Sequence, residues 1–260
     1  MQEILKKMHK WIADYMKSFY TADEEVQRGI LTKEKHTGYV TSNCVELAKN
    51  LNFSKHDTEI AEIIGLFHDV GRFRQYSIYK TFNDADSEDH ADLAVKVIEE
   101  LDLFKKIPAV DYEIVKFAIQ QHNKKNIAPC NDERKILFAK VIRDADKLDI
   151  YRVLEPYLAQ ENVDKMPNFI KNKGKLVADV SPDFVENFVT GNQADYNKIR
   201  TNGDRKIVRL MWIYDVNFVW TMKKIIERGY IEKIVENLPH DEKISEGVER
   251  LRDYVENFIK

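Results

Sequence analysis

His68 and Asp69 stand side by side in an otherwise apolar segment, "GLFHDVGRF", which covers residues 65–73. At helical spacing His68 follows Ile64 by one turn, so its imidazole shares the face that packs inward. A carboxylate is costly to bury unless it is paired with a cation or bound to one. The two residues therefore predict a positive charge, such as a metal ion, next to Asp69.

Polar side chains take the same place on an apolar helix face at four more positions. They are His36, His90, His122 and Asp146. Imidazole and carboxylate together suit divalent Mn, Fe, Co, Ni or Zn, with water completing the coordination. A single buried histidine is more often a hydrogen-bonded core residue than a ligand. Six such placements on several helices favour a metal-ligand cluster, in which His90 and His122 individually have the weaker claim.

Helices are the elements expected to carry these residues. Nine Gly, six Pro and few alternating apolar runs are typical of an all-α protein. One helix follows a cap at Ser54 or Asp57, and another, with Leu93 and Val97 on its apolar face, follows Ser87. Further helices are predicted at the N-terminus and over 111–122, 133–154 and 206–238, with shorter helices and loops over 168–205. His9, His56 and His240 are expected to be exposed.

Composition and charge exclude several classes of protein. The 41 Lys and Arg against 44 Asp and Glu, a net charge of -3, give no reason to expect general nucleic-acid binding. No apolar run is long enough to span a bilayer, and the N-terminal helix lacks the features of a signal peptide. Cys44 and Cys130 form no paired motif, so the expected location is the reducing cytoplasm.

The order of the candidate ligands resembles a known family. His36 in "HTGYV", the pair in "GLFHDVGR" and Asp146 in "ADKLD" are similar to the metal ligands of the HD superfamily of metal-dependent phosphohydrolases. The resemblance covers roughly residues 30–155 and implies a helical HD-domain bundle whose first metal is held by His36, His68, Asp69 and Asp146. Residues 1–29 are then expected to form a helix packed on this core, and 156–260 helices that complete the same domain.

Members of the family with two metals carry extra histidines between the HD pair and the distal Asp, where this chain has His90 and His122. The resemblance thus implies one or two divalent ions (Mn, Fe, Ni, Co, Mg or Zn), with Asp69 bridging two. His122 is followed by Asn123 rather than a second His, and no Gly-Tyr-Pro signature follows. Hydrolysis of cyclic di-GMP is therefore not supported.

The implied chemistry is hydrolysis of a phosphate ester by metal-activated water, on a nucleotide or another small phosphorylated metabolite. Asp69, Arg72 and Lys147 are the predicted catalytic residues, and Arg72, Arg74 and Lys147 the predicted phosphate ligands, because cations match the phosphoryl charge. Lys147 has an equal alternative role as an ion-pair partner of Asp144 or as a solvated residue on the helix surface. Glu88 and Asp149 are unranked candidates for acid or base. The aromatic side chains available to stack on a base are Tyr76, Tyr79 and Phe82.

Two other functions stay open from the sequence. Some proteins that look similar use a di-iron centre with the ligand order His, His-Asp, His, His, Asp to oxygenate an organic substrate, and this chain has that order. The second is a non-catalytic HD-like protein that binds a nucleotide. A homodimer is also a candidate, through part of the aromatic segment "MWIYDVNFVW" (residues 211–220).

Overall fold

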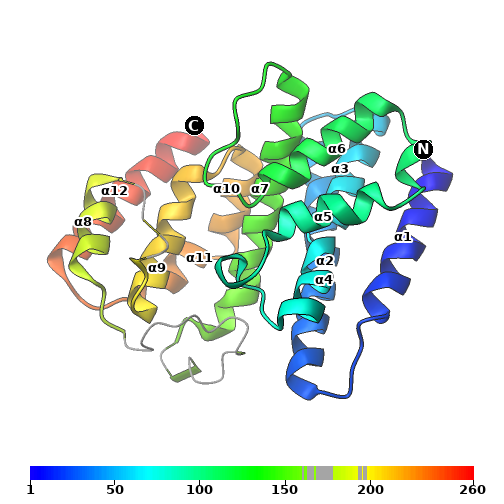
Figure 1. Ribbon diagram of the computed structural model, residues 1–260. Helices are drawn as coiled ribbons and strands as arrows, with labels where there is room; N and C mark the ends of the chain where they lie inside the picture. Colours follow the sequence, from blue (N-terminus) through cyan, green and yellow to red (C-terminus); the bar gives the residue numbers. More distant parts are fainter. Residues whose placement is uncertain (160, 163–166, 168–177, 193–194, 196–197) are drawn as a thin grey trace. The chain divides into compact units, whose positions relative to one another are not determined.

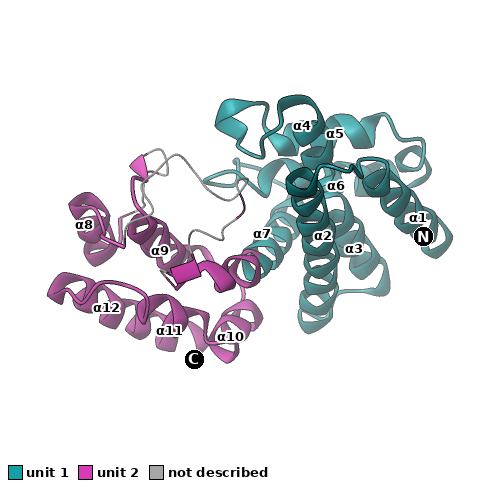
Figure 2. Cartoon of the chain, turned by 90° about the horizontal axis from the view of Figure 1, so that it is seen from below, with its two compact units in different colours: residues 1–149 teal, residues 150–260 magenta. Residues whose placement is uncertain are grey.

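The computed structural model describes residues 1–159, 161–162, 167, 178–192, 195 and 198–260. These residues form helices joined by turns and loops, and no strand occurs among them (Figure 1). The predicted all-α class is therefore confirmed. The chain forms two compact units, Met1–Asp149 and Ile150–Lys260, which are coloured separately in Figure 2. The boundaries expected after residues 29 and 155 stay a prediction about domain organisation.

Unit 1, Met1–Asp149, holds most of the helices that the sequence pattern predicts. In chain order its helices are α1 (Gln2–Lys17), α2 (Glu24–Asn50), α3 (Lys55–Phe67), α4 (Val70–Tyr79), η1 (Asp84–Asp86), α5 (His90–Glu99), η2 (Phe104–Lys106), α6 (Ala109–Gln121) and the greater part of α7 (Glu133–Leu154). Within this unit α3 packs against α1, α2 and α6, and α5 packs against α4 and α6. Their apolar faces meet in one core, where Ile60, Ile64 and Phe67 are almost completely buried.

Helix caps set where two of these helices begin. Ser54 caps α3, because its side chain accepts a hydrogen bond from the backbone N–H of Asp57. The expectation that the next helix follows Ser87 was wrong by two residues. Asp89 is the cap of α5 and accepts from the N–H groups of Ala91 and Asp92. The Ser87 hydroxyl instead donates to the carbonyl of Asn83, in the loop before the helix.

Two glycines allow the helices of unit 1 to approach closely. A Cβ atom at Gly65 would lie 2.8 Å from the Cα of Thr41, so α3 and α2 touch backbone to backbone there. A Cβ atom at Gly71 would lie 2.5 Å from the backbone N of Ala94 and closer still to the carbonyl oxygen of His90. Because these neighbours are backbone atoms, they cannot rotate away. Gly71 therefore fixes the distance between α4 and the start of α5.

Unit 2, Ile150–Lys260, is also helical in its described part. After the end of α7 it contains η3 (Glu155–Tyr157), α8 (Pro182–Thr190), α9 (Asn202–Met211), η6 (Trp212–Asp215), α10 (Val219–Glu227), α11 (Tyr230–Val235) and α12 (Glu242–Ile259). Phe184 and Phe188 of α8 are buried against α12 and α9. Part of the segment 168–205, where short helices and loops are predicted, lies outside the described residues.

The aromatic segment 211–220 contributes to the core of unit 2. Ile213 and Val216 are buried, whereas Val219 is 42% exposed. A homodimer through this segment stays a prediction. None of the helices described here has an apolar stretch of the length and composition that crossing a membrane requires.

Replacing Gly71 with Ala is expected to lower the free energy of unfolding by about 1–3 kcal/mol, because the new methyl group overpacks the contact between α4 and α5. Gly38→Ala is the matched control, since Gly38 is exposed in α2 and a Cβ atom there meets nothing within 4 Å. That variant is expected to gain about 0.5–1 kcal/mol from helix propensity. Urea unfolding followed by circular dichroism measures both changes, and a Gly71→Ala chain as stable as Gly38→Ala contradicts the close approach.

Candidate metal centre

All six candidate ligands lie in unit 1, and most of them stand at the ends of helices. His36 lies within α2, His68 ends α3, Asp69 precedes α4, His90 begins α5, His122 ends α6 and Asp146 lies in α7. The four histidines and Asp69 are buried, and Asp146 is half-buried. Six helices, α2 to α7, thus place these polar side chains within unit 1.

Asp69 lies between two groups of histidines. Its Oδ2 atom is 3.5 Å from Nε2 of His36 and 3.8 Å from Nε2 of His68. Its Oδ1 atom is 3.5 Å from Nε2 of His90 and 3.9 Å from Nε2 of His122. One carboxylate therefore turns one oxygen atom toward each pair of imidazoles.

Within each group the Nε2 atoms face one another. The Nε2 atoms of His36 and His68 are 3.4 Å apart, and those of His90 and His122 are 3.0 Å apart. Asp146 joins the first group, because its Oδ1 atom lies 3.1 Å from Nε2 of His36. The structure thus brings all six predicted residues together, as two adjacent sets that share Asp69.

Backbone carbonyls fix the tautomer of two of the histidines. Nδ1 of His68 lies 2.7 Å from the carbonyl oxygen of Gly65, and Nδ1 of His122 lies 2.7 Å from that of Ile119. A carbonyl oxygen only accepts hydrogen bonds, so Nδ1 is the donor in both imidazoles. In the neutral ring the lone pair is then on Nε2, which faces the cluster.

Carboxylates orient the other two histidines. Nδ1 of His36 donates to Oδ2 of Asp149 at 2.6 Å, and Nδ1 of His90 donates to Oδ2 of Asp84 at 2.6 Å. A carboxylate behind a histidine holds the ring in place and makes the opposite nitrogen a better metal ligand. All four Nε2 atoms are therefore aimed by a hydrogen bond on the far side of the ring.

Burial and neighbouring charges set the protonation of the cluster. Burial lowers the pKa of His68 to about 4, and burial, reinforced by the charge of Arg72, lowers the pKa of His90 to about 3. Both rings are thus neutral near pH 7, which is the form that binds metals. Burial raises the pKa of Asp69, but the charge of Lys33, followed by those of protonated His68 and of Arg72, outweighs this effect and holds that pKa well below its usual range.

His36 and Asp146 behave as a pair. Burial and the charge of Lys33 lower the pKa of His36, but hydrogen bonds to Asp146 and Asp149 outweigh them and raise it. Burial raises the pKa of Asp146, and the hydrogen bond and charge of His36 overcome this and lower it. The carboxylate groups of Asp69 and Asp146 are therefore ionised near pH 7. Their negative charge favours a cation, such as a metal ion, beside His36.

Two cations that touch Asp69 complete the cluster. Lys33 donates from Nζ to Oδ2 of Asp69 at 2.7 Å, and Nε of Arg72 lies 3.5 Å from Oδ1. Nη1 of Arg72 donates to Asp84 at 2.8 Å and to the carbonyl of Phe82. Lys33 and Arg72 thus supply positive charge beside Asp69, in addition to any that a metal ion brings, and Arg72 also holds the loop that contains Asp84.

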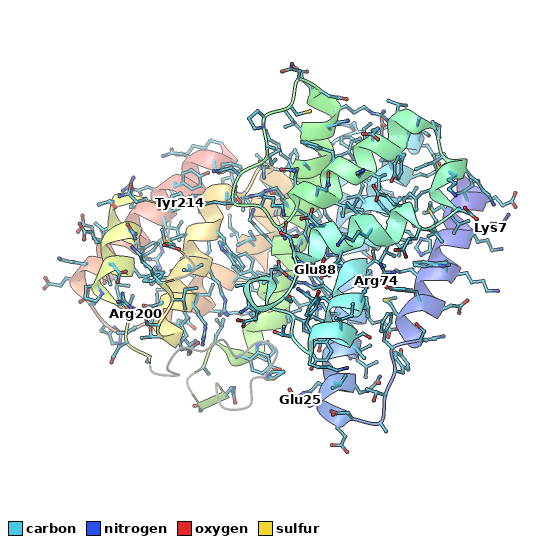
Figure 3. All side chains as sticks on the ribbon, viewed as in Figure 1. Lys7, Glu25, Arg74, Glu88, Arg200 and Tyr214 are labelled. Atoms are coloured by element: carbon cyan, nitrogen blue, oxygen red, sulfur yellow. The ribbon has the colours of Figure 1, made fainter. Side chains whose placement is uncertain are left out.

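The remaining predicted residues lie in different surroundings. Arg74, labelled in Figure 3, forms a two-pronged ion pair with Glu100, at 3.0 and 2.6 Å. Lys147 follows Asp146 in α7 and is half-buried. Glu88, also labelled in Figure 3, is half-buried and pairs with Lys96 at 2.8 Å.

The predicted stacking residues partly contact one another. The rings of Tyr76 and Phe82 stack with centroids 4.4 Å apart, and Tyr76 is only 8% exposed. Tyr79 is exposed at the surface and donates to Glu88. The exposed positions expected for His9 and His56 are confirmed, although both rings are paired, with Glu62 and Asp111 respectively.

Sequence reasoning missed the partners of the ligands. Lys33 lies three residues before His36 on the same helix, so helical spacing could have placed it on that face. Asp149 follows Asp146 by three residues and was considered only as an acid or base. Asp84 lies in the short helix η1 before α5, and no periodicity relates it to His90. Its role becomes visible only in the structure.

The donor set fits divalent metal ions. Nitrogen atoms of four imidazoles and oxygen atoms of two carboxylates are ligands that such ions take. Two groups of candidate ligands share Asp69: His36 with His68, and His90 with His122. The separation of the two groups by one carboxylate matches the arrangement of a bridged two-metal site.

Comparison with protein families agrees with this geometry. Residues 34–151 match the model of the HD domain, a stretch that contains all six candidate ligands. Residues 34–151 of this chain therefore form an HD domain, as the sequence resemblance predicted. The superfamily is largely composed of hydrolases, and its domains bind divalent metals. Searches of the curated proteins and of the solved structures each found no match.

The carboxylates behind His36 and His90 allow the two groups to be tested separately. Asp149→Asn is expected to weaken one metal site and Asp84→Asn the other, each by about 10- to 100-fold, because the ring loses its orienting charge. Competition with a chromophoric chelator measures both affinities. Glu88→Gln, in the same loop region but directed to Lys96, is the control. Equal weakening of both sites by either variant contradicts the division into two groups.

Proposed function

We propose that this chain is a metal-dependent phosphohydrolase that cleaves a phosphate ester in a small molecule. The observation that carries the proposal is the position of Asp69, whose two oxygen atoms face two pairs of Nε2 atoms. The family match supports the same class of chemistry. We infer that the substrate is a nucleotide or another small phosphorylated metabolite.

The six candidate ligands would bind two metal ions. His36, His68 and Asp146 would hold the first ion, His90 and His122 the second, and Asp69 both. When bound, such ions lower the pKa of a coordinated water and neutralise charge on phosphoryl oxygens. The chain itself supplies the rigid ligands and a site with little access to bulk water. In the overall reaction the water oxygen bonds to phosphorus, the ester P–O bond breaks, and the leaving oxygen takes up a proton.

Cations near Asp69 are suited to the remaining negative charge of the phosphoryl group. Lys33 contacts Asp69 and its side chain is 20% exposed, so its ammonium group lies at the edge of the buried cluster. Arg72 is fixed by Asp84 and Gln75, and its Nε atom faces Asp69 without a hydrogen-bond partner. We propose Arg72 and Lys33 as phosphate-facing residues and keep Lys147 as a further candidate.

The two residues considered as acid or base have other partners. Asp149 is the acceptor for His36. Glu88 interacts with Lys96 and Tyr79. We therefore propose that Asp149 acts by positioning His36, and that the leaving group is protonated by water or by a group of the substrate.

A di-iron oxygenase is the second candidate function, because the four imidazoles and two carboxylates stand together in the order that such proteins use. The two chemistries differ in what they consume. A phosphohydrolase releases inorganic phosphate without using oxygen, whereas an oxygenase requires iron and takes up oxygen with its substrate. A nucleotide that is bound and recovered unchanged with every metal would support the non-catalytic alternative instead.

Asp69→Asn is expected to abolish both bound ions and to lower phosphatase turnover at least a thousandfold, because the amide cannot bridge two cations. Elemental analysis and release of phosphate from a panel of phosphomonoesters measure the two effects. The variant Asp57→Asn, which alters a carboxylate of α3 that pairs with Arg134, serves as the control. Retention of both metal and turnover in Asp69→Asn would falsify the proposed site.

Arg72 and Arg74 can be separated in the same assay. Arg72→Met is expected to reduce kcat/KM about a hundredfold, since a fixed cation near the reacting group is lost. Arg74→Met is expected to have a much smaller effect, because the guanidinium of Arg74 is engaged by Glu100. Equal losses of kcat/KM in the two variants would contradict a specific role of Arg72 in binding the phosphoryl group.

A further inference from the structure

Helix α9 of unit 2 buries a polar face. This face contains Asn202, Arg205, Lys206 and Arg209. The last three lie three, four and seven residues after Asn202, so all four side chains share one side of the helix. Their exposed fractions are 0%, 5%, 1% and 6%. Cationic side chains are almost never buried this completely unless they are paired. We call this side of α9 the basic face, and its burial needs an explanation.

Asp204, the acidic residue of the same helix, already has other hydrogen-bond partners. Asp204 is buried in the same helix and its charge acts on Arg205. Both of its oxygen atoms already accept hydrogen bonds, from Ser181 N and Oγ at 2.7 and 2.9 Å and from Arg200 N and Thr201 N at 2.8 and 3.0 Å. These bonds form the start of α9, so Asp204 acts as a cap.

Lys206 is also paired without being neutralised. Its Nζ atom donates to the backbone carbonyl of Asn237 at 2.7 Å. Burial lowers the pKa of Lys206 to about 8, and the charge of Arg209 adds to this. Burial, reinforced by Arg205, lowers the pKa of Arg209 to about 10. In both cases the cations of the basic face repel one another.

Hydrogen-bonding atoms on the basic face lack partners. Nη1 of Arg209 and both amide atoms of Asn202 are buried, and none of them has a hydrogen-bond partner. Leaving such atoms unpaired in the interior costs about 1–3 kcal/mol each, and more for a charged group. Donors of this kind, beside cationic side chains that repel one another, are features of a binding site for a negatively charged group.

We propose that the basic face of α9 binds an oxyanion, with Arg209 as its cationic contact and Asn202 as a neutral one. Phosphate is the group of choice, because a guanidinium fork matches its oxygen atoms bidentately. Arginine side chains on a helix lean toward its N-terminus, so the guanidinium of Arg209 is directed toward the turn that follows Asn202. The site involves only unit 2, and the inference does not depend on the chemistry of the metal centre.

Two variants and a matched control test this site in the full chain with its metals bound. Isothermal titration with inorganic phosphate, in buffer of constant ionic strength, is compared for the natural sequence and for Arg209→Met, Asn202→Ala and Arg228→Met. Arg228 is an exposed arginine of the same unit. Any phosphate that binds at the metal centre contributes equally to all four proteins, so a binding event lost only in the first two variants reports on α9.

The expected result is one binding event that is at least about tenfold weaker in Arg209→Met and Asn202→Ala than in Arg228→Met. Without phosphate, Arg209→Met is expected to melt at the same temperature as the natural sequence or higher, because an unbalanced buried charge is removed. An alkyl phosphonate, which cannot be hydrolysed as an ester, separates the two sources of the oxyanion. Tighter binding of the phosphonate indicates a phosphorylated molecule, and tighter binding of inorganic phosphate indicates the free ion.

Two results would overturn the proposal. One is phosphate binding that is unchanged in both Arg209→Met and Asn202→Ala. The other is a large loss of thermal stability of Arg209→Met in phosphate-free buffer together with unchanged binding in Asn202→Ala, which would make Arg209 a structural residue. Because Asn202→Ala removes no charge and only a small side chain, it keeps the test valid if Arg209→Met does not fold.

Discussion

The burial of the Asp69 carboxylate is the constraint on which the rest of unit 1 depends. An ionised carboxylate in an apolar core needs positive charge and hydrogen-bond donors around it. Lys33 and Arg72 supply the charge, and four imidazoles surround the two oxygen atoms. These groups come from α2, α3, α4, α5 and α6, so the helices have to converge on one point. The side chain of Asp69 is thus the point at which these five helices meet.

The helix ends make this convergence possible. Asp69 lies in the short break between α3 and α4, which lets consecutive residues of the HD pair face different partners. Gly71 then brings the next turn of α4 against the backbone of α5 at the point where His90 begins that helix. The carboxylates of Asp84 and Asp149 act one layer further out. They bond to the far nitrogen atoms of His90 and His36, so that η1 and α7 both help to position candidate metal ligands.

The sequence predicts the helices and the ligands for the same reason, because both follow from helical periodicity. A polar residue one turn from a buried Ile or Leu has to lie inside, and this placed His68 and Asp146 correctly in the core of unit 1. Periodicity does not extend through loops, so the link between Asp84 and His90 could not be predicted. It also does not show which charged residues on a regular helix are covered by other elements. The buried basic face of α9 was therefore recognised only from the structure.

The central claim is that Asp69 bridges two metal ions. Crystals grown with manganese, measured at the manganese absorption edge, test it most directly. The account predicts two anomalous peaks roughly 3.5–4 Å apart, one beside His36 and His68 and the other beside His90 and His122, with one oxygen atom of Asp69 bound to each. A single peak, or two peaks that do not share Asp69, would contradict it.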